Sequence, residues 1–275
     1  TELSYHNQKL VPNAIEPRAA LAYFDSNDDK YTLYTTSQNP HVARLIICAF
    51  VLSIPEHKLR VISPDVGGGF GSKIFVYNDE CGVLWAAKQI GRPVKWTADR
   101  TEAFFTDCHG RDHVTDAKIA LDKEGNIIGL RTKTYASMGA YLSTLSTCIP
   151  TWVHGTLMQG LYTSPAVHVD VTAVVTNTVP VDAVRGAGRP EATYGIERLV
   201  ETAAREIGMD PAEFRLKNFI PPFDGVKQPG YQTQVALQYD SGNYEGALKK
   251  VLKNANYEQL KKERAAARSD GKLMG

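Results

Sequence analysis

The 275-residue sequence contains few cysteines, and no two of them form a Cys-x-x-Cys pair. That spacing gives no pattern for a zinc site or an iron–sulfur cluster held by this chain. Two of the cysteines fall within apolar helical patterns, where a free thiol behaves as a small hydrophobe. We therefore expect four reduced thiols and a cytoplasmic location. The four cysteines are Cys48, Cys81, Cys108 and Cys148.

Two further absences narrow the class of protein. No apolar run reaches the length of a transmembrane helix. The chain has 31 basic and 30 acidic residues, a formal net charge of +1, and its basic residues are scattered. This balance gives no argument for a nucleic-acid or membrane-surface partner. The N-terminus is no signal peptide and does not begin with Met, which indicates a chain cut from something longer.

Strand and helix patterns are mixed without strict alternation, which predicts an α+β fold of mixed sheets with packed helices. Asp122–Gly125 has the sequence of a hairpin turn. A loop is expected at 221–242, and an amphipathic helical region at 243–268. The expected strands are 31–37, 59–63, 93–98, 114–121, 126–136 and 167–176, and the expected helices are 40–53, 79–90, 189–208 and a short one capped by Asp210.

The glycine-rich segment Pro64–Lys73 follows an apolar strand pattern and contains three consecutive glycines. Glycine has no Cβ, so the backbone can take positive φ and approach another object closely. Successive backbone N–H groups in such a turn can face an anion or an oxo group together. Phe70 adds one bulky face beside the gap. The alternative is a tight turn that closes a strand–helix unit.

A second glycine-containing segment, Ala183–Ala192, lies between a predicted strand and a predicted helix. It places two arginines, Arg185 and Arg189, at the helix entrance. The free N–H groups and the positive dipole end of a helix N-terminus both favour anions. Arginine adds planar donors suited to phosphate. The alternative is a turn whose arginines pair with surface acids.

Two shorter polar segments contain further candidate site residues. Gln38 ends a strand just before a helix, where its amide nitrogen can donate to an oxo group, unless it is only a satisfied turn residue. His109 and His113 would face together only on a helix. The glycine between them and the following strand pattern argue against a helix and against metal ligation. We expect instead a buried hydrogen-bond network of His, Arg111 and Asp112.

Together these segments resemble the large subunit of the molybdenum hydroxylases, which include xanthine dehydrogenase, aldehyde oxidoreductases and aerobic carbon monoxide dehydrogenase. The resemblance implies a first molybdopterin-binding domain at 26–220. Residues 1–25 would be the tail of a preceding small α/β domain or a lead-in strand, and 221–275 a loop and helical extension. The matching blocks, in the family's order, are Ile15–Ala19, Ser37–His41, Pro64–Lys73, His109–Asp112, Gly139–Tyr141 and Ala183–Ala192.

The resemblance also implies a cofactor and residue roles. The cofactor is molybdopterin, often as its cytosine dinucleotide, which carries the molybdenum, so that no protein atom ligates the metal. Gln38 would hydrogen-bond a molybdenum oxo ligand, and Gln38, Phe70 and Arg185 are the candidate catalytic residues. The residues expected to contact the cofactor, besides these three, are Gly68, Gly69, Gly71, Gly186, Ala187 and Gly188.

By resemblance, the reaction hydroxylates an aldehyde or N-heterocycle carbon with oxygen derived from water. Electrons would then pass to [2Fe–2S] clusters and FAD on partner subunits. Two departures bear on the substrate. Gly186 stands where the carbon monoxide enzyme has its copper-holding cysteine, which argues against that reaction. Ile74–Val76 lacks the glutamate that purine-oxidising members carry after the glycine loop.

The chain is far shorter than the family's large subunit. The second cofactor domain, which carries a glutamate general base, has no counterpart here. We therefore expect this chain to be inactive alone and to need the remainder of the large subunit or a second molybdopterin-domain polypeptide. A non-catalytic pterin- or nucleotide-binding or assembly module is the alternative. A P-loop enzyme is disfavoured because Ser72 and Lys73 stand in reversed order and too close to the glycines.

Overall fold

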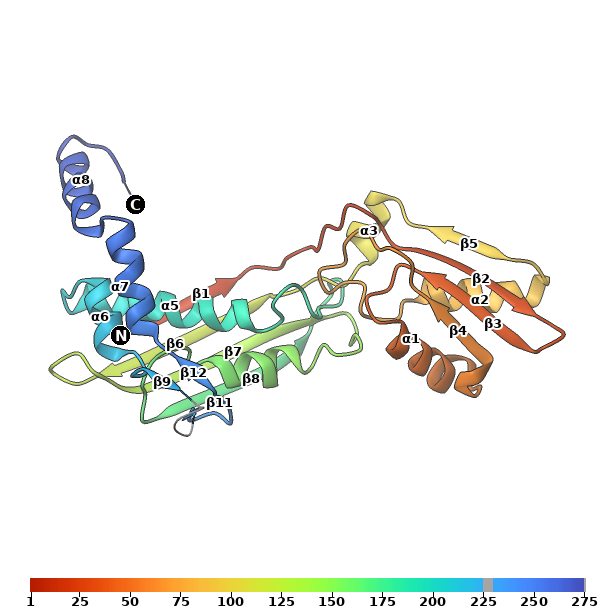
Figure 1. Cartoon of the computed structure of the whole chain (residues 1–275), viewed down its shortest axis with the longest axis horizontal. Helices are drawn as coiled ribbons and strands as arrows, with labels where there is room; N and C mark the ends of the chain where they lie inside the picture. The colour runs from red at the N-terminus through yellow and green to blue at the C-terminus, as the bar shows by residue number, and fades with distance from the viewer. Residues whose placement is uncertain (225–229, 275) are drawn as a thin grey trace.

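The computed structural model describes residues 1–224 and 230–274. Figure 1 shows two lobes arranged along the long axis of the molecule, joined by loops near its centre. Each lobe is built on a four-stranded sheet, and helices pack against both sheets. The predicted α+β fold of mixed sheets with packed helices is therefore confirmed.

The first sheet is mixed. Its first two strands along the chain, β2 and β3, pair antiparallel, and β2 also pairs antiparallel with β5. β3 and β4 run parallel, so the chain must cross between them through helical residues. In order across the sheet the strands are β4 (Leu59–Ile62), β3 (Lys30–Thr35), β2 (Ala19–Asp25) and β5 (Val94–Thr97).

Helices α1 and α2 cover this first sheet, and they confirm two of the predicted helices. The crossover helix ends at Ser53, which has a φ of 51°. Asn78 was expected to cap α2, but Tyr77 occupies the cap position, and its N–H donates to the Glu80 carboxylate at 3.0 Å. Gly91 ends α2 with a φ of 64°. The helical elements here are α1 (Pro40–Ile46), the π-helical η1 (Ile47–Leu52), the 3₁₀ turn η2 (Glu56–Lys58), α2 (Asn78–Ile90) and α3 (Arg100–Thr106).

The second sheet is longer and carries the predicted hairpin. β6 pairs antiparallel with β1 and β7, and β7 runs parallel to β8. Gly125 closes the hairpin with a φ of 83°, and the Asp122 carboxylate accepts from the N–H groups of Glu124 and Asn126. In order across the sheet the strands are β1 (Glu2–Asn7), β6 (His113–Leu121), β7 (Ile127–Gly139) and β8 (Val167–Val175).

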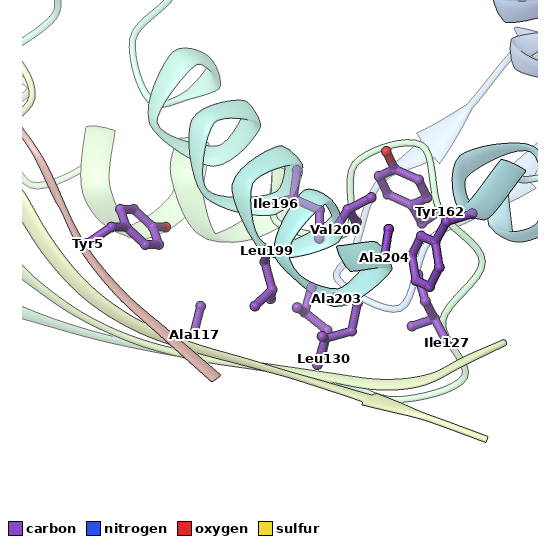
Figure 2. Packing of buried hydrophobic residues seen from close by; sticks show 12 residues of the cluster. Tyr5, Ala117, Ile127, Leu130, Tyr162, Ile196, Leu199, Val200, Ala203 and Ala204 are labelled. Carbon is purple, nitrogen blue, oxygen red and sulfur yellow. The ribbon is translucent and has the colours of Figure 1, made fainter. Parts of the chain in front are cut away.

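Helix α5 (Arg189–Glu206) lies across one face of this second sheet and forms the main core of its lobe (Figure 2). Apolar residues at spacings of three and four place one stripe of the helix toward the sheet. Figure 2 shows this stripe above the side chains that rise from β1, β6 and β7. The buried stripe comprises Ile196, Leu199, Val200, Ala203 and Ala204, and the sheet side includes Tyr5, Ala117, Ile119, Ile127 and Leu130.

The C-terminal part is less regular. The Asp210 carboxylate caps the next helix by accepting from the N–H groups of Ala212 and Glu213, as predicted. The expected helical region at 243–268 is two helices, interrupted at Asn256 with a φ of 50°. The remaining elements are η3 (Ile149–Val153), α4 (His154–Leu157), α6 (Pro211–Asn218), β9 (Phe223–Asp224), β10 (Tyr231–Gln232), β11 (Gln238–Tyr239), β12 (Ser241–Gly242), α7 (Tyr244–Asn254) and α8 (Tyr257–Ser269).

The expected loop at 221–242 contains four of these two-residue strands, and its residues 225–229 lie outside the described residues. All four cysteines are free, with Cys48 and Cys108 buried. Within residues 1–224 and 230–274, no helix has the length and apolar character needed to span a bilayer. The domain boundaries at 25 and 220 stay a prediction.

Candidate functional site

Gln38 lies between β3 and α1, and two hydrogen bonds fix it. Its backbone N–H donates to the Lys73 carbonyl at 2.8 Å. Its side-chain Oε1 accepts from the N–H of Gly71 at 2.9 Å. Because the oxygen is engaged, the amide nitrogen Nε2 is directed elsewhere, and it has no hydrogen-bond partner among the described residues. The side chain is exposed, so this donor is available to a ligand.

The glycine loop takes the strained backbone that its sequence predicts. Gly68 and Gly71 have φ values of 93° and 106°, and Phe70 lies between them at 53°. A Cβ at Gly69 would overlap the Gln38 side chain, and a Cβ at Gly71 would overlap the Ala183 carbonyl. Close approach therefore requires glycine at both positions, and at Gly71 the positive φ requires it as well. Phe70 is 44% exposed.

The segment Ala183–Ala192, here called the arginine loop, contacts the glycine loop (Pro64–Lys73) directly. The N–H of Arg185 donates to the carbonyl of Phe70 at 2.8 Å. Gly186 and Gly188 have φ values of 104° and 80°, and Ala187 has a φ of 38°. A Cβ at Gly188 would lie 2.7 Å from the backbone nitrogen of His154. The predicted strand–loop–helix layout is confirmed, since α5 begins at Arg189.

Two hydrogen bonds thus bring together three segments that are distant in sequence. Gln38, Phe70 and Arg185 all lie at this junction and are all exposed. The Arg185 guanidinium makes no hydrogen bond or ion pair with the described residues. The exposed side chains at the junction are therefore an amide donor, an aromatic ring and a cation without a partner among the described residues. That set suits a large ligand with anionic and acceptor groups.

Arg111 holds the arginine loop from beneath, which was not predicted. Its guanidinium donates to the carbonyls of Val184 and Arg185 at 2.9 and 2.8 Å, and it pairs with Glu191 at 3.3 Å. Burial raises the pKa of the Glu191 carboxyl, and the charge of Arg111 opposes that rise. Arg111 belongs to the block at 109–112, which is visible in the sequence, but its hydrogen bond to the Arg185 carbonyl depends on tertiary structure.

The predicted network of His, Arg111 and Asp112 is wrong, because each member has separate partners. His109 contacts the carbonyl of Phe104 at 3.1 Å. Asp112 lies nearer the surface, within 3.2 Å of His6 and 3.6 Å of Lys9. Backbone geometry explains the separation. Residues 111 and 112 have φ values of 68° and 73°, which turns successive side chains in different directions.

His109 and His113 are not on a helix, as expected. His109 precedes β6 and His113 begins it. The ring of His113 instead lies edge-on to that of His154, with centroids 5.0 Å apart. Burial lowers the pKa of His113 to about 4 and that of His154 to about 3. The first residue of β6 and the first residue of α4 thus form a neutral buried pair.

The junction fits molybdopterin in its chemistry. A pterin with a phosphate needs close backbone approach, polar donors and positive charge, and it brings its own metal ligand. The glycine positions provide the close approach, Gln38 Nε2 provides a free donor, and Arg185 provides the charge. Within the described parts of the chain, no group of three His, Cys, Asp or Glu side chains could hold a metal ion directly. The residues present are compatible with a metal carried by its cofactor.

Comparison with known proteins identifies the family of this chain. The sequence model of the family described as "Molybdopterin cofactor-binding domain" matches residues 1–219. The carbon monoxide dehydrogenase large chain of Hydrogenophaga pseudoflava is 40% identical over 265 residues, which cover 95% of this chain and 32% of the relative. Subunit gamma of the 6-hydroxypseudooxynicotine dehydrogenase complex of Paenarthrobacter nicotinovorans is 33% identical over 262 residues, with 95% and 33% covered.

Among solved structures, quinoline 2-oxidoreductase from Pseudomonas putida 86 superposes with a TM-score of 0.91 at 29% identity. The match covers 98% of this chain and 34% of that one. The chain therefore spans about a third of the length of the curated relatives it matches. Since the family match covers most of the sequence and the fold agrees, this chain belongs to the molybdopterin cofactor-binding domain family of the molybdenum hydroxylase large subunits.

Proposed function

We propose that this chain supplies one side of the molybdopterin cradle in an oxidoreductase that hydroxylates an aldehyde or N-heterocycle carbon with oxygen from water. The observation that supports this most is the junction of three loops. Oε1 of Gln38 accepts from Gly71, the carbonyl of Phe70 accepts from Arg185, and the amide nitrogen of Gln38 has no partner within residues 1–224 and 230–274. This arrangement orients a donor that the fold itself does not use.

Each loop has its own role in the proposed cradle. Nε2 of Gln38 would donate to an acceptor atom of the bound cofactor, and the backbone of Gly68–Gly71 would lie against the cofactor's metal end. Phe70 would present its ring toward the substrate side. The loop from Arg185 through Gly186, Ala187 and Gly188 would hold the pterin. The bound cofactor, as molybdopterin or its cytosine dinucleotide, supplies the two-electron redox chemistry, and the protein binds, orients and shields it.

The cradle is open on one side. Gln38 and Arg185 are exposed, and Phe70 is 44% exposed, so these residues form a surface and not an enclosed pocket. The proposed cover is the remainder of the large subunit or a second molybdopterin-domain polypeptide, which would also bring the general base. The chain alone would then be inactive. Further proposed partners are an iron–sulfur subunit with [2Fe–2S] clusters and an FAD subunit, all cytoplasmic.

The residues at two places in the sequence bear on the class of substrate. Gly186 has no thiol to hold copper, which disfavours carbon monoxide despite the 40% identical carbon monoxide dehydrogenase large chain. Ile74–Val76 contains no acid after the glycine loop, which disfavours purines. Relatives named for nicotine hydroxylation and quinoline oxidation are compatible with an N-heterocycle. An aldehyde is the second class to be tested.

The test is chemical analysis of the native complex purified through this chain. We expect molybdenum, pterin and chain in equal molar amounts, with co-purifying iron–sulfur and flavin subunits. The complex should reduce an artificial electron acceptor with an N-heterocycle or an aldehyde, and not with carbon monoxide. An intact complex without pterin would contradict the proposal. Pterin without molybdenum and without turnover would favour the non-catalytic binding module.

A further inference from the structure

Lys73, the last residue of the glycine loop, is a buried lysine. Its side chain is only 1% exposed. Nζ donates to the backbone carbonyl of Glu16 at 2.7 Å and to Oε2 of the same residue at 3.0 Å. A buried ammonium is stable only when it is paired and hydrogen-bonded. Glu16 provides both kinds of acceptor from one residue.

The Glu16 carboxylate continues this chain of contacts into the glycine loop. The same Oε2 that binds Lys73 also accepts from the N–H of Gly67 at 2.7 Å. The backbone N–H of Glu16 donates to the Gly67 carbonyl at 3.2 Å. Although burial alone would raise it, the pKa of Glu16 is lowered by the hydrogen bonds from Gly67 and Lys73. The entrance to the glycine loop is therefore tied to a segment about fifty residues earlier.

Lys73 also fixes the other side of the junction through its backbone. Its carbonyl accepts from the N–H of Gln38 at 2.8 Å, and the hydroxyl of Ser37 lies 3.4 Å from the same oxygen. One residue thus holds the start of the glycine loop through its side chain and the Gln38 segment through its main chain. The distance between the glycine loop and the Gln38 segment sets the direction of the Gln38 amide.

We propose that Lys73, together with Glu16, is a positioning pair that fixes the glycine loop relative to Gln38 and so orients the free amide donor. If the ammonium is removed, the Glu16 carbonyl and carboxylate lose the hydrogen bonds from Lys73, and the side chain of residue 73 is no longer held in place. Movement of residue 73 displaces the carbonyl that holds Gln38. The pair acts through other residues and does not itself face the junction surface.

The experiment is hydrogen–deuterium exchange with mass spectrometry on the whole protein, as purified with its subunits. The variants are Lys73→Met, Lys73→Arg and Glu16→Ala. Lys118→Met is the matched control, because Lys118 pairs with Glu2 on the surface, where both side chains are more than half exposed. Peptides covering 66–73 and 36–40 report on the junction, and peptides from β6 and β7 report on the rest of the fold.

We expect Lys73→Met to accelerate exchange roughly tenfold or more in both junction peptides, with β6 and β7 unchanged. Lys73→Arg should restore part of the protection, because a guanidinium can reach the same two oxygens. Glu16→Ala should accelerate exchange only in 66–73, since the link from the Lys73 carbonyl to Gln38 remains. Glu16→Ala leaves Lys73 its backbone acceptor, and the Glu16 side chain is 36% exposed, so water can replace the lost carboxylate and this variant should fold even if Lys73→Met does not.

Two results would overturn the proposal. Junction peptides that exchange at the wild-type rate in Lys73→Met would show that the pair does not position the loop. Acceleration that is equal in β6 and β7 would show a role in general stability only. For Glu16→Ala, a wild-type exchange rate in peptide 66–73 or equal acceleration in β6 and β7 would overturn the proposal in the same way.

The expected effect of Lys73 and Glu16 on cofactor binding rests on the proposed function. A second measurement, the pterin retained per chain, distinguishes failure of the proposed function from failure of the positioning pair. Pterin retained per chain should fall about tenfold in Lys73→Met and stay unchanged in Lys118→Met. If the wild-type protein holds no pterin, the proposed function fails, while the exchange measurement still tests the positioning pair. If wild type and Lys73→Met hold equal pterin and exchange equally, the positioning pair alone fails.

Discussion

The backbone N–H of Gly71 donates to Oε1 of Gln38 at 2.9 Å, across 33 residues of sequence. This bond decides which end of the amide is free. An amide has one acceptor and one donor end, and in the described part of the chain only the acceptor end has a partner. The two ends can therefore be tested separately by substitution.

The first prediction concerns Gln38→Glu. Glutamate keeps an oxygen that can accept from Gly71 but has no amide nitrogen to donate. We expect the free energy of unfolding to change by less than about 1 kcal/mol, and turnover by the loaded complex to fall about 100-fold or more. Urea unfolding and steady-state kinetics check the two parts. Gln89→Glu, at an exposed position of α2, is the control and should leave both unchanged.

Unchanged turnover in Gln38→Glu would contradict the proposed donor role. A large loss of stability with proportional loss of pterin would assign Gln38 to the loop's structure instead.

The second prediction concerns Gly71→Ala. The new Cβ would meet the Ala183 carbonyl, and residue 71 would have to keep a φ of 106°. We expect the free energy of unfolding to fall by about 2 kcal/mol or more. Gly82→Ala is the matched control, because a Cβ there meets nothing within 4 Å on helix α2. It should raise stability by about 0.5–1 kcal/mol. Urea unfolding of both variants measures these changes. Equal changes in the free energy of unfolding would show that position 71 tolerates a side chain.

The third prediction concerns Arg111→Met. This change leaves the Glu191 carboxylate without its cation and two loop carbonyls without their donors, all in a buried place. We expect a loss of about 3–5 kcal/mol in the free energy of unfolding. Arg111→Lys should recover part of it, because lysine keeps the charge but not the fork of donors.

The control for Arg111 is Arg205→Met on the outer face of α5. Arg205 is 71% exposed and pairs with Glu201 in the same helix. Removing it should cost less than about 1 kcal/mol. If Arg111→Met costs no more than this control, the buried pair does not hold the arginine loop.

The fourth prediction is a pH dependence. Burial lowers the pKa of His113 to about 4 and of His154 to about 3, so both are neutral in the folded chain. The unfolded chain takes up these protons near the ordinary value of 6.5. Their contribution to stability is therefore complete above about pH 6.5 and is lost as the pH falls toward 4, by about 1.4 kcal/mol per pH unit for each histidine.

Buried carboxyls oppose this trend, so a variant comparison is needed. Burial raises the pKa of Glu80, Asp182 and Glu191, and such groups favour the folded chain as the pH falls. We expect His154→Gln to reduce the loss of stability between about pH 7 and about pH 5. His168→Gln, on the exposed side of β8, should leave the pH profile as it is. An identical profile in all three proteins would contradict the prediction.

Most of the fold could be predicted because local patterns and tertiary structure agree. The stripe on α5, the turn at Gly125 and the cap at Asp210 are all decided by nearby residues. The interruption at Asn256 was missed, because amphipathic spacing continues across it. Helix α3 was also missed, since its short sequence lacks a clear apolar period.

The candidate site could be predicted only in part. Glycines and a strand-end glutamine are visible in the sequence, and the resemblance placed them at one cofactor. The residues that hold the loops in place are different. Arg111 and Lys73 reach partners tens of residues away, and no local pattern distinguishes them from surface cations. The network expected at 109–112 does not form, because positive φ at residues 111 and 112 turns their side chains in different directions.

The most direct test of the account is anomalous diffraction at the molybdenum edge from crystals of the native complex. We predict an anomalous peak beside Nε2 of Gln38, facing the ring of Phe70 and the loop at Arg185. A peak elsewhere in the complex, or none in a complex with these loops intact, would contradict the claim that the three loops form the cofactor cradle.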